Sequence, residues 1–243
     1  MNRAELRSED RRKRHHPVTG GYARGRATRA KIVGSALEIF GAYGFDGAST
    51  RMIADKARVN LPALAYYFGD KRGVYRACAE HIAARLEAHL GPTVERIRFA
   101  LAQEHPSRAR RLALLQDFFD TFADLLIGGR EPEAWVLFII REQAQPTAAF
   151  DILFEHVMRR FARTGAGLVG GLMELPPDDP RVLARTLMLF GGVLFFRTAR
   201  EASLRVLGWR DFRGRRLSFL KDALHDHVTA SLGGRIRSGE NHA

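Results

Sequence analysis

Two adjacent tyrosines are the residues of this sequence that packing in a core explains least. Tyr66 and Tyr67 precede Phe68 in the stretch ARVNLPALAYYFGDK. Neighbouring side chains on a helix point in different directions, so at least one phenol faces away from any core. Phenolic hydroxyls and a lysine ammonium are groups that contact phosphate oxygens. Tyr66, Tyr67 and the nearby Lys71 therefore predict contact with the backbone of a nucleic acid.

Groups for catalysis or metal binding are poorly placed by comparison. Cys78, the one cysteine, falls on an apolar helical face, which favours a small core residue over a nucleophile. His81 and His89, and likewise His225 and His227, lack the spacing and the supporting ligands of a metal site. An enzyme is the rival class of protein. We predict that the chain is not an enzyme and needs no metal and no cofactor.

The charge distribution favours a polyanionic partner. The net charge is +12, and residues 1–75 hold 15 Lys and Arg against 7 Asp and Glu, so most of the excess lies early in the chain. A concentrated positive field attracts nucleic acid or an anionic membrane surface. Membrane binding is disfavoured because no apolar face accompanies the basic residues. The expected partner is double-stranded DNA.

Neither a membrane span nor a secretory signal is expected. The longest apolar run, residues 187–196, is well short of the roughly 20 residues that cross a bilayer. The first thirty residues are polar and rich in arginine, unlike a signal peptide. We expect a cytoplasmic protein that associates with the nucleoid when it is bound to DNA.

The elements that position the tyrosines begin after a basic segment. Residues 1–27 have no apolar periodicity and predict a disordered arm. Two alternatives stay open for this arm: it follows phosphates or a minor groove, or it is a solvated tail without a role. Thr28 is placed as the N-cap of a first helix that Gly44 ends. The apolar face of this helix is Ile32, Val33, Ala36, Leu37 and Phe40.

Two further short helices complete a helix-turn-helix pattern. Ser49 and Thr50 can cap the first of them, and Asn60 can cap the second, after a turn at Arg58. In this motif the second helix enters the major groove of DNA. Leu64 and Phe68 are expected to turn inward, and Ile53, Ala54 and Ala57 likewise. The residues assigned to DNA contact are Thr28, Ser49, Thr50, Arg51, Asn60, Leu61, Pro62, Ala63, Ala65, Tyr66, Tyr67 and Lys71.

This part of the chain resembles the TetR/AcrR family of bacterial transcriptional regulators. The resemblance lies in TRAKIVGSALEIFGAYGFDGASTRMIADKARVNLPALAYYFGDK. The sequence departs from the family at Arg58, where glycine is usual, and at Ala65, where an aromatic residue is common. The stretches NLPALAYYFGDKRGVYRACAEHIA, REQAQPTAAFDILFEHV and FFRTARE are similar to the CecR (YbiH-like) branch. The resemblance implies a dimeric, ligand-responsive repressor of genes for export of drugs or toxic compounds.

Beyond the motif the sequence predicts only helices, so the expected fold is all-α. A long helix should follow Lys71, with a kink near Gly91 and Pro92, and others are expected at 108–127, 132–143, 147–173, 180–207 and 214–232. The expected organisation is a disordered arm at 1–27, a helix-turn-helix DNA-binding domain at 28–72, a helical ligand-binding and dimerisation domain at 73–233, and a flexible tail at 234–243.

The second domain is expected to form a homodimer. Residues 187–196 are apolar on all sides of a helix, so a partner is expected to cover one side. The last helix carries an apolar stripe that would join it in a four-helix contact. The alternative is an ordinary buried core helix. The residues assigned to dimerisation are Gly191, Val193, Phe195, Leu217, Leu220, Leu224 and Val228.

The second domain is also expected to bind an unidentified small-molecule effector. Aromatic walls with a few charged groups are typical of ligand pockets. We therefore assigned Trp135, Phe138, Arg141, Glu142, Phe190, Leu194, Arg197 and Glu201 to this role, on the expectation that the charged ends converge. The alternative is that these charged groups form surface ion pairs.

These observations predict a regulator with two conformations, whose populations shift when an effector binds. A dimer would bind a pseudopalindromic operator, and an effector would change the spacing of its two recognition helices. The rival is an architectural protein that binds DNA without sequence preference. Binding that survives excess random DNA at moderate salt distinguishes the regulator from the rival.

Overall fold

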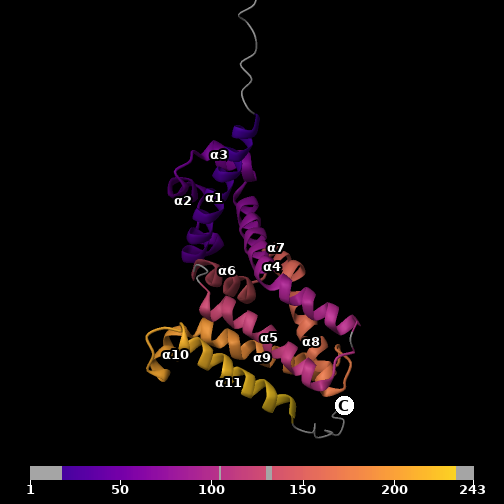
Figure 1. Cartoon of the computed structure of the whole chain (residues 1–243). Coiled ribbons are helices and arrows are strands. Elements are labelled where there is room, and N and C mark those ends of the chain that lie inside the picture. Colours follow the sequence, from indigo (N-terminus) through magenta and orange to yellow (C-terminus); the bar gives the residue numbers. More distant parts are fainter. Residues whose placement is uncertain (1–17, 104, 130–132, 234–243) are drawn as a thin grey trace, which may run out of the picture.

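The computed structural model describes residues 18–103, 105–129 and 133–233, and every regular element in these ranges is a helix. Three helices form a head, and one long helix runs from the head into a larger body (Figure 1). The head contains α1 (Val18–Gly47), α2 (Thr50–Ala57) and α3 (Leu61–Phe68), and the long helix is α4 (Lys71–Gln103). The predicted all-α fold, with an amino-terminal three-helix unit, is confirmed.

The helices of the head end where local sequence signals predict. The Ser49 hydroxyl accepts a hydrogen bond from the Met52 backbone N–H at 3.2 Å and caps α2. The Asn60 side-chain oxygen accepts one from the Ala63 N–H at 2.9 Å and caps α3. Between them Arg58 adopts the left-handed conformation, with φ 50° and ψ 49°. The predicted caps and turn are therefore present.

The apolar faces predicted for the head form its core. Ile32, Leu37 and Phe40 of α1, Ile53 of α2 and Leu64 of α3 are each at most 2% exposed. They pack together with the first turns of α4, so α3 is held on the head from behind. The opposite side of α3 is exposed.

The first helix begins earlier than the sequence predicts. α1 starts at Val18, so Thr28 lies inside it, and its hydroxyl donates back to the Arg24 carbonyl at 2.9 Å. The N-cap assignment of Thr28 is therefore wrong, and residues 18–27 are helical rather than part of a disordered arm. Residues 1–17 of that arm and the predicted tail at 234–243 lie outside the described residues. Gly44 interrupts α1 with φ 72°, as its assignment as a helix breaker predicted.

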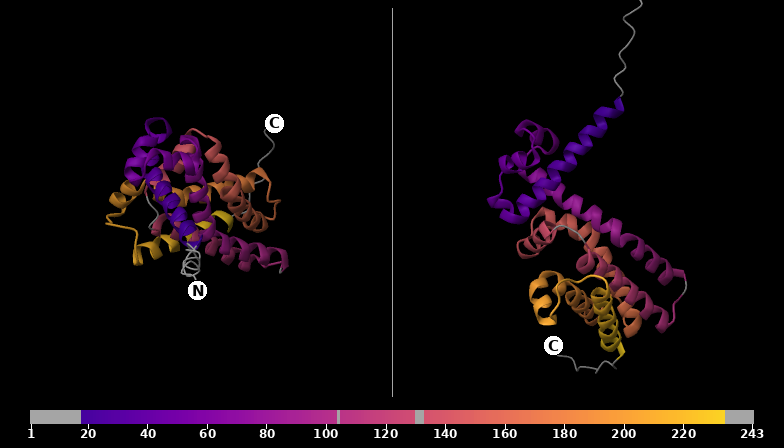
Figure 2. Two further views of the ribbon diagram at one scale, coloured as in Figure 1. Left: turned by 90° about the horizontal axis from the view of Figure 1, so that it is seen from above. Right: turned by 60° about the vertical axis from the view of Figure 1, so that its left-hand side comes forward.

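The body contains the remaining helices. They are α5 (Arg108–Ala123), η2 (Asp124–Gly128), α6 (Glu133–Ala144), α7 (Ala148–Leu153), η3 (Phe154–Met158), α8 (Arg159–Met173), α9 (Pro180–Thr198), α10 (Arg200–Leu207) and α11 (Arg215–Gly233). Here η2 and η3 are π-helical segments that continue α5 and α7. Figures 1 and 2 show α5, α9 and α11 running alongside one another below the head.

One predicted helix of the body is two. The helix expected at 180–207 breaks at Ala199, and α9 and α10 meet at an angle of 85°. Within the described ranges no single helix is long and apolar enough to cross a membrane. The bent pair α9 and α10 passes that test together, on length and composition alone.

Stacked phenylalanines form the centre of the body. Phe118 lies 4.1 Å from Phe161 between ring centroids, and Phe190 lies 5.3 Å from Phe161. A side chain at Gly165 would come within 3.3 Å of Phe118 and Phe190, so α5, α8 and α9 approach closely there. Phe190, which we assigned to the ligand site, is thus a core residue that is 7% exposed.

Candidate functional site

The outward side of α3 is the first candidate surface. Leu61 and Pro62 occupy its first positions, Ala65 is exposed, and Tyr66 is 83% exposed. Leu64, on the opposite side, is 2% exposed and holds the helix on the core. The amino-terminal end of α3 therefore presents small and apolar side chains, with a phenol one turn later.

The side chains of the two tyrosines differ in exposure and in the contacts they make. Tyr66 packs its ring edge on Tyr67, with centroids 5.1 Å apart and planes at 80°. Tyr67 is half-buried, with Phe68 at 6.2 Å on one side and Gly25 of α1 near its hydroxyl on the other. The expectation that both phenols face freely outward thus holds for Tyr66, while Tyr67 also fixes α1 against α3.

Several other residues assigned to DNA contact have structural partners of their own. The side-chain oxygens of Ser49 and Asn60 are occupied as caps, and Thr50 is half-buried in the first turn of α2. The Lys71 ammonium lies 4.5 Å from the centroid of the Phe45 ring and 3.5 Å from the Asp46 carbonyl oxygen. Arg51 and Ala65 are exposed, and Ala63 is half-buried. Of this set, Arg51, Leu61, Pro62, Ala65 and Tyr66 are exposed and are not occupied as caps.

The early turns of α1 carry Arg24, which sequence analysis placed in the arm, and Arg29, which it placed in the first helix. Arg24 is exposed, and Arg29 lies 5.3 Å over the Phe68 ring and 3.7 Å from Glu80. In Figure 2, right, this end of α1 projects beyond the rest of the head. Arg24 was missed as an ordered surface residue because the apolar period of α1 begins only after Thr28.

A buried polar cluster joins the head to the body. The Tyr75 hydroxyl of α4 donates to the Glu142 carboxylate of α6 at 2.7 Å, and Glu142 is 1% exposed. The other carboxylate oxygen of Glu142 accepts from the Thr147 backbone N–H and hydroxyl. Burial raises the pKa of Tyr75 far above its usual range, and the hydrogen bond and charge of Glu142 raise it further. In this cluster the neutral Tyr75 hydroxyl is the donor, and both carboxylate oxygens of Glu142 accept hydrogen bonds.

Arg141, next to Glu142, holds α1. Its guanidinium donates to the Gly41 and Ala42 carbonyls at 3.4 Å each. A side chain at Gly41 would come within 3.0 Å of Ala134, so α1 and α6 are in close contact. Arg141 and Glu142 therefore act at the joint between head and body.

The charged groups assigned to a ligand pocket do not converge. Arg197 and Glu201 line a groove of about 440 Å³ against the opposite face of α6, beside Leu137 and Ile140. Trp135 and Phe138 turn the other way, toward His81 at 5.3 Å and Tyr75 at 4.5 Å. Leu194 is 41% exposed. The expected single pocket is thus divided between the joint, the core and the groove on α6.

A large apolar surface lies along α9. Leu187, Met188 and Phe195 are 63%, 72% and 57% exposed. Gly191 and Gly192 lie between them, and a side chain at either would meet no atom within 4 Å. Such a surface marks an interaction site more often than a solvated face. Leu187 and Met188 belong to the apolar run that predicts the dimer, but not to the residues assigned to dimerisation.

The buried members of the dimerisation list need correction. Val193, Leu220 and Val228 are 1%, 8% and 0% exposed within the chain itself. They belong to the core of the body and cannot contact a partner without unpacking it. Leu217 and Leu224 are half-buried, and Gly191 and Phe195 are exposed. An apolar run on all sides of a helix does not reveal which side its own domain covers.

The described residues contain little that suits metal or nucleophilic chemistry. In the ranges that the structure covers, no three His, Cys, Asp or Glu side chains gather as metal ligands would. Cys78 is fully buried, and burial raises the pKa of its thiol far above the usual range. Since the thiolate is the reactive form, Cys78 is inert at neutral pH.

Comparison with known proteins bears on both halves of the chain. Residues 32–78 match the family described as bacterial regulatory proteins, tetR family. Residues 112–235 match the C-terminal domain of the HTH-type transcriptional dual regulator CecR. The chain is 30% identical over 211 residues to CecR of Shigella flexneri, covering 87% of this chain and 94% of that protein.

Two solved structures show the same arrangement of helices. A putative transcriptional regulator from Pseudomonas aeruginosa PAO1 matches with a TM-score of 0.59 at 18% identity, over 86% of this chain and 93% of that one. AibR in complex with isovaleryl coenzyme A and operator DNA matches with a TM-score of 0.57 at 12% identity, over 84% and 97%. At these identities the similarity is one of fold.

Proposed function

This chain belongs to the TetR family of bacterial transcriptional regulators and has a C-terminal domain of the CecR type, and from that premise we propose a homodimeric, ligand-responsive repressor of a pseudopalindromic operator. Its family is one of DNA-binding regulators rather than enzymes. The proposal concerns what the family leaves open: the contacting residues, the dimer and the control by a ligand.

The observation that carries the proposal is the exposed side of α3. Leu61, Pro62 and Ala65 are exposed on it, and we expect the exposed Tyr66 to reach a phosphate beside the groove. Arg51 of α2 is exposed as well and is expected to contact another phosphate. We therefore assign groove contacts to Leu61, Pro62 and Ala65, and phosphate contacts to Tyr66 and Arg51.

The dimer is proposed to form through the exposed apolar surface of α9 and the adjoining side of α11. A two-fold axis brings the same surface of both copies together. The exposed side chains of each copy are then covered by the same apolar surface of the other copy. Gly191 and Gly192 allow close approach of the two backbones. A dimer of this kind would hold two α3 helices about 34 Å apart, the spacing of successive major grooves.

Control by a ligand is proposed to pass through α6 and α4. The groove lined by Arg197 and Glu201 lies on one side of α6, and Arg141 and Glu142 hold the head from its other side. A ligand that favours one position of α6 would change operator affinity, typically by about 1–3 kcal/mol. AibR, which shares the fold, was solved with both an acyl coenzyme A and operator DNA, and this supports the same logic here.

The regulated genes are proposed from the family resemblance alone to be those for efflux or response to toxic compounds. Such a protein acts in the cytoplasm and on the nucleoid. We take the DNA-binding unit to extend from α1 to the start of α4, and the body to perform dimerisation and sensing. An architectural DNA-binding protein without sequence preference is the competing function.

The test is selection of bound sites from random duplex DNA by the full chain. A regulator enriches two half-sites related by a dyad, with centres about 10 base pairs or a multiple apart. Ala65→Glu, which adds a negative charge to the outward side of α3, should abolish enrichment. Ala109→Glu makes the same change on exposed α5 and should leave it intact. Equal recovery of all sequences by the unmodified chain would favour the architectural protein.

A further inference from the structure

A groove lined by arginines runs between the carboxyl-terminal half of α4 and the start of α8. Its volume is about 620 Å³. Figure 1 places this part of the body at the opposite end of α4 from α3. The lining residues are Arg98, Leu101, Ala102, Glu155, Arg159, Arg160, Arg163 and Thr164.

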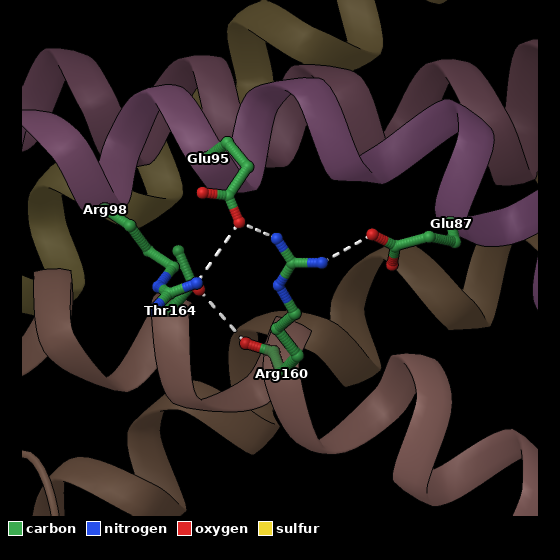
Figure 3. A network of polar contacts seen from close by, with 5 residues as sticks. All are labelled: Glu87, Glu95, Arg98, Arg160 and Thr164. Atoms are coloured by element: carbon green, nitrogen blue, oxygen red, sulfur yellow. Dashed lines mark hydrogen bonds and ion pairs between the residues drawn. The ribbon is translucent and has the colours of Figure 1, made fainter.

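Carboxylates of α4 hold two of these arginines in place. Glu95 accepts from Arg98 at 3.1 Å and also pairs with Arg160, so one carboxylate is shared by two guanidinium groups (Figure 3). Arg160 reaches Glu87 with its other terminal nitrogen. Figure 3 shows Arg98 and Arg160 approaching Glu95 from two sides, and the Thr164 hydroxyl donates to the Arg160 carbonyl at 3.0 Å. Arg160 thus links α8 to α4.

The network leaves donors and charge unmet. Arg163 is exposed, and its guanidinium has no hydrogen bond or ion pair to any other residue that the structure describes. The Nε of Arg160 is buried and has no acceptor among those residues either. Arg159 pairs with Glu155 through one nitrogen.

The charges of the groove do not cancel. Among the residues that the structure describes, the four arginines that line it have three carboxylates as ion-pair partners, those of Glu87, Glu95 and Glu155, so there is one arginine more than there are paired carboxylates. Each guanidinium carries five N–H donors, and most of those in the groove have no acceptor among the described residues. The groove therefore has both the charge and the free donors to bind an anion.

We propose that this groove binds a small organic anion that carries two or more phosphate or carboxylate groups. Guanidinium groups bind such oxyanions in pairs of parallel hydrogen bonds, so Arg98, Arg159 and Arg163 can share two anionic groups. Leu101 and Ala102 provide an apolar wall for the carbon skeleton of the ligand. DNA is not the occupant, because α3 lies at the other end of α4.

The position of the groove gives the anion a way to act. An anion that bonds both Arg98 on α4 and Arg163 on α8 fixes the far end of α4, the helix that continues into the head. This regulatory step rests on the proposed function and deepens it by naming the chemical class of an effector. Binding of the anion itself does not depend on that function.

Calorimetric titration of the full chain with sodium pyrophosphate, at constant ionic strength, tests the proposal. The expected result is saturable binding with one site per chain. Arg163→Gln should raise the Kd about tenfold or more, the effect of losing a charge-assisted contact. Arg98→Gln should raise it similarly. Arg210→Gln removes the same charge from an exposed position outside the groove and should leave the Kd unchanged.

Citrate, titrated in parallel, distinguishes the two sources of anionic oxygen. Tighter binding of pyrophosphate identifies a phosphate ligand, tighter binding of citrate a carboxylate ligand, and either supports the groove. Absence of saturable binding for both anions would overturn the proposal. So would equal weakening in Arg163→Gln and Arg210→Gln, or loss of binding in Arg51→Gln, which would place the anion on the head.

The failure of this proposal and that of the proposed function can be told apart. A chain that enriches no operator but binds pyrophosphate through Arg163 loses the proposed function and keeps the groove. A chain that enriches an operator but binds neither anion loses the groove alone. Melting curves of Arg163→Gln show whether the variant is folded, and no change is expected because Arg163 has no partner in the described part of the chain.

Discussion

The outward side of α3 and the surface of α9 both expose large side chains, but their chemical surroundings differ. On α3, Tyr66 is 83% exposed, and Arg51 on the neighbouring helix α2 is exposed as well. On α9, Leu187, Met188 and Phe195 are more than half exposed, and the residues between them include two glycines. Exposure alone would not separate these surfaces. The groups beside the exposed side chains do.

The difference indicates two kinds of partner. Phenol and guanidinium groups stay hydrated when free and suit a wet, charged interface such as DNA. A continuous apolar surface costs about 25 cal/mol for each Å² left in water, so it is best covered by another apolar surface. The chain offers one of its own, which is why we propose a second copy as the partner of α9.

The largest effect is expected from charging the apolar surface. Phe195→Glu would place a carboxylate twice in the proposed two-fold interface, once from each copy. Because an unpaired buried charge is costly, we expect the dimer Kd to rise by at least about 100-fold, or roughly 3 kcal/mol. Sedimentation equilibrium measures this shift.

Phe99→Glu provides the matched control for the α9 surface. Phe99 is 65% exposed but lies on α4, outside the proposed interface. Its substitution should leave the dimer intact. Equal dissociation in both variants would mean that any exposed charge disrupts the dimer, and the contrast between the two surfaces would be lost.

The next effect concerns the joint that holds the two surfaces in one geometry. Tyr75→Phe removes the hydroxyl that donates to the buried Glu142 carboxylate. Leaving such an acceptor with an unmet bond costs about 1–3 kcal/mol of unfolding free energy. Urea unfolding measures it, and Tyr43→Phe, at a residue 57% exposed, should change stability by less than about 0.5 kcal/mol. Equal stability of the two variants would remove the joint from the account.

The same residue gives the stability a pH dependence of known sign. The pKa of Tyr75 is raised in the folded chain, so its neutral form is favoured by folding. Its contribution to stability is therefore complete below the unfolded pKa of about 10 and is lost as the pH rises above it. The wild-type chain should lose more stability than Tyr75→Phe between pH 9 and 11. Parallel curves for the two proteins would contradict the assignment.

A smaller gain is expected at the turn that sets the angle of α3. Arg58 has φ 50°, a conformation that costs a residue with a side chain about 1–2 kcal/mol. Arg58→Gly should stabilise the chain by about 1 kcal/mol or less, since glycine also loses more entropy on folding. Thermal unfolding measures it. A loss of stability would mean that the Arg58 side chain makes a contact worth more than the strain.

The smallest expected effect is on the salt dependence of binding, which should differ between the two surfaces. Arg51→Gln should lower the slope of log K against log salt for DNA binding by about one unit. Dimer affinity should respond little to salt, because the α9 surface is apolar. Fluorescence anisotropy across a salt series measures the first, and sedimentation the second. An unchanged DNA slope would remove Arg51 from the phosphate contacts.

The head was predictable because its signals are local. Ser49 and Asn60 cap helices through bonds that reach only three residues along the chain. Thr28 misled for a local reason as well: a threonine inside a helix bonds back to the carbonyl four residues earlier, and sequence alone does not separate this from a cap. The start of α1 at Val18 was therefore missed.

The body was predictable in its helices but less so in its sites. Glu142 and Arg141 are adjacent in sequence, yet their partners are Tyr75 and the carbonyls of Gly41 and Ala42. Such pairings depend on how the helices pack across one another, and helical periodicity in the sequence gives no information about that. Likewise the pattern of α9 shows apolar residues on all sides, and only packing shows that Val193 is inside and Phe195 outside.

The central claim, that α3 presents its outward side to DNA, is tested most directly by one matched pair. Tyr66 and Val206 are 83% and 86% exposed, on α3 and α10 respectively. We predict that Tyr66→Ala weakens binding to the selected operator by about 5- to 30-fold, the loss of one contact to a charged group, while Val206→Ala binds as the wild-type chain does. Equal affinity of both variants and the wild-type chain would contradict the claim.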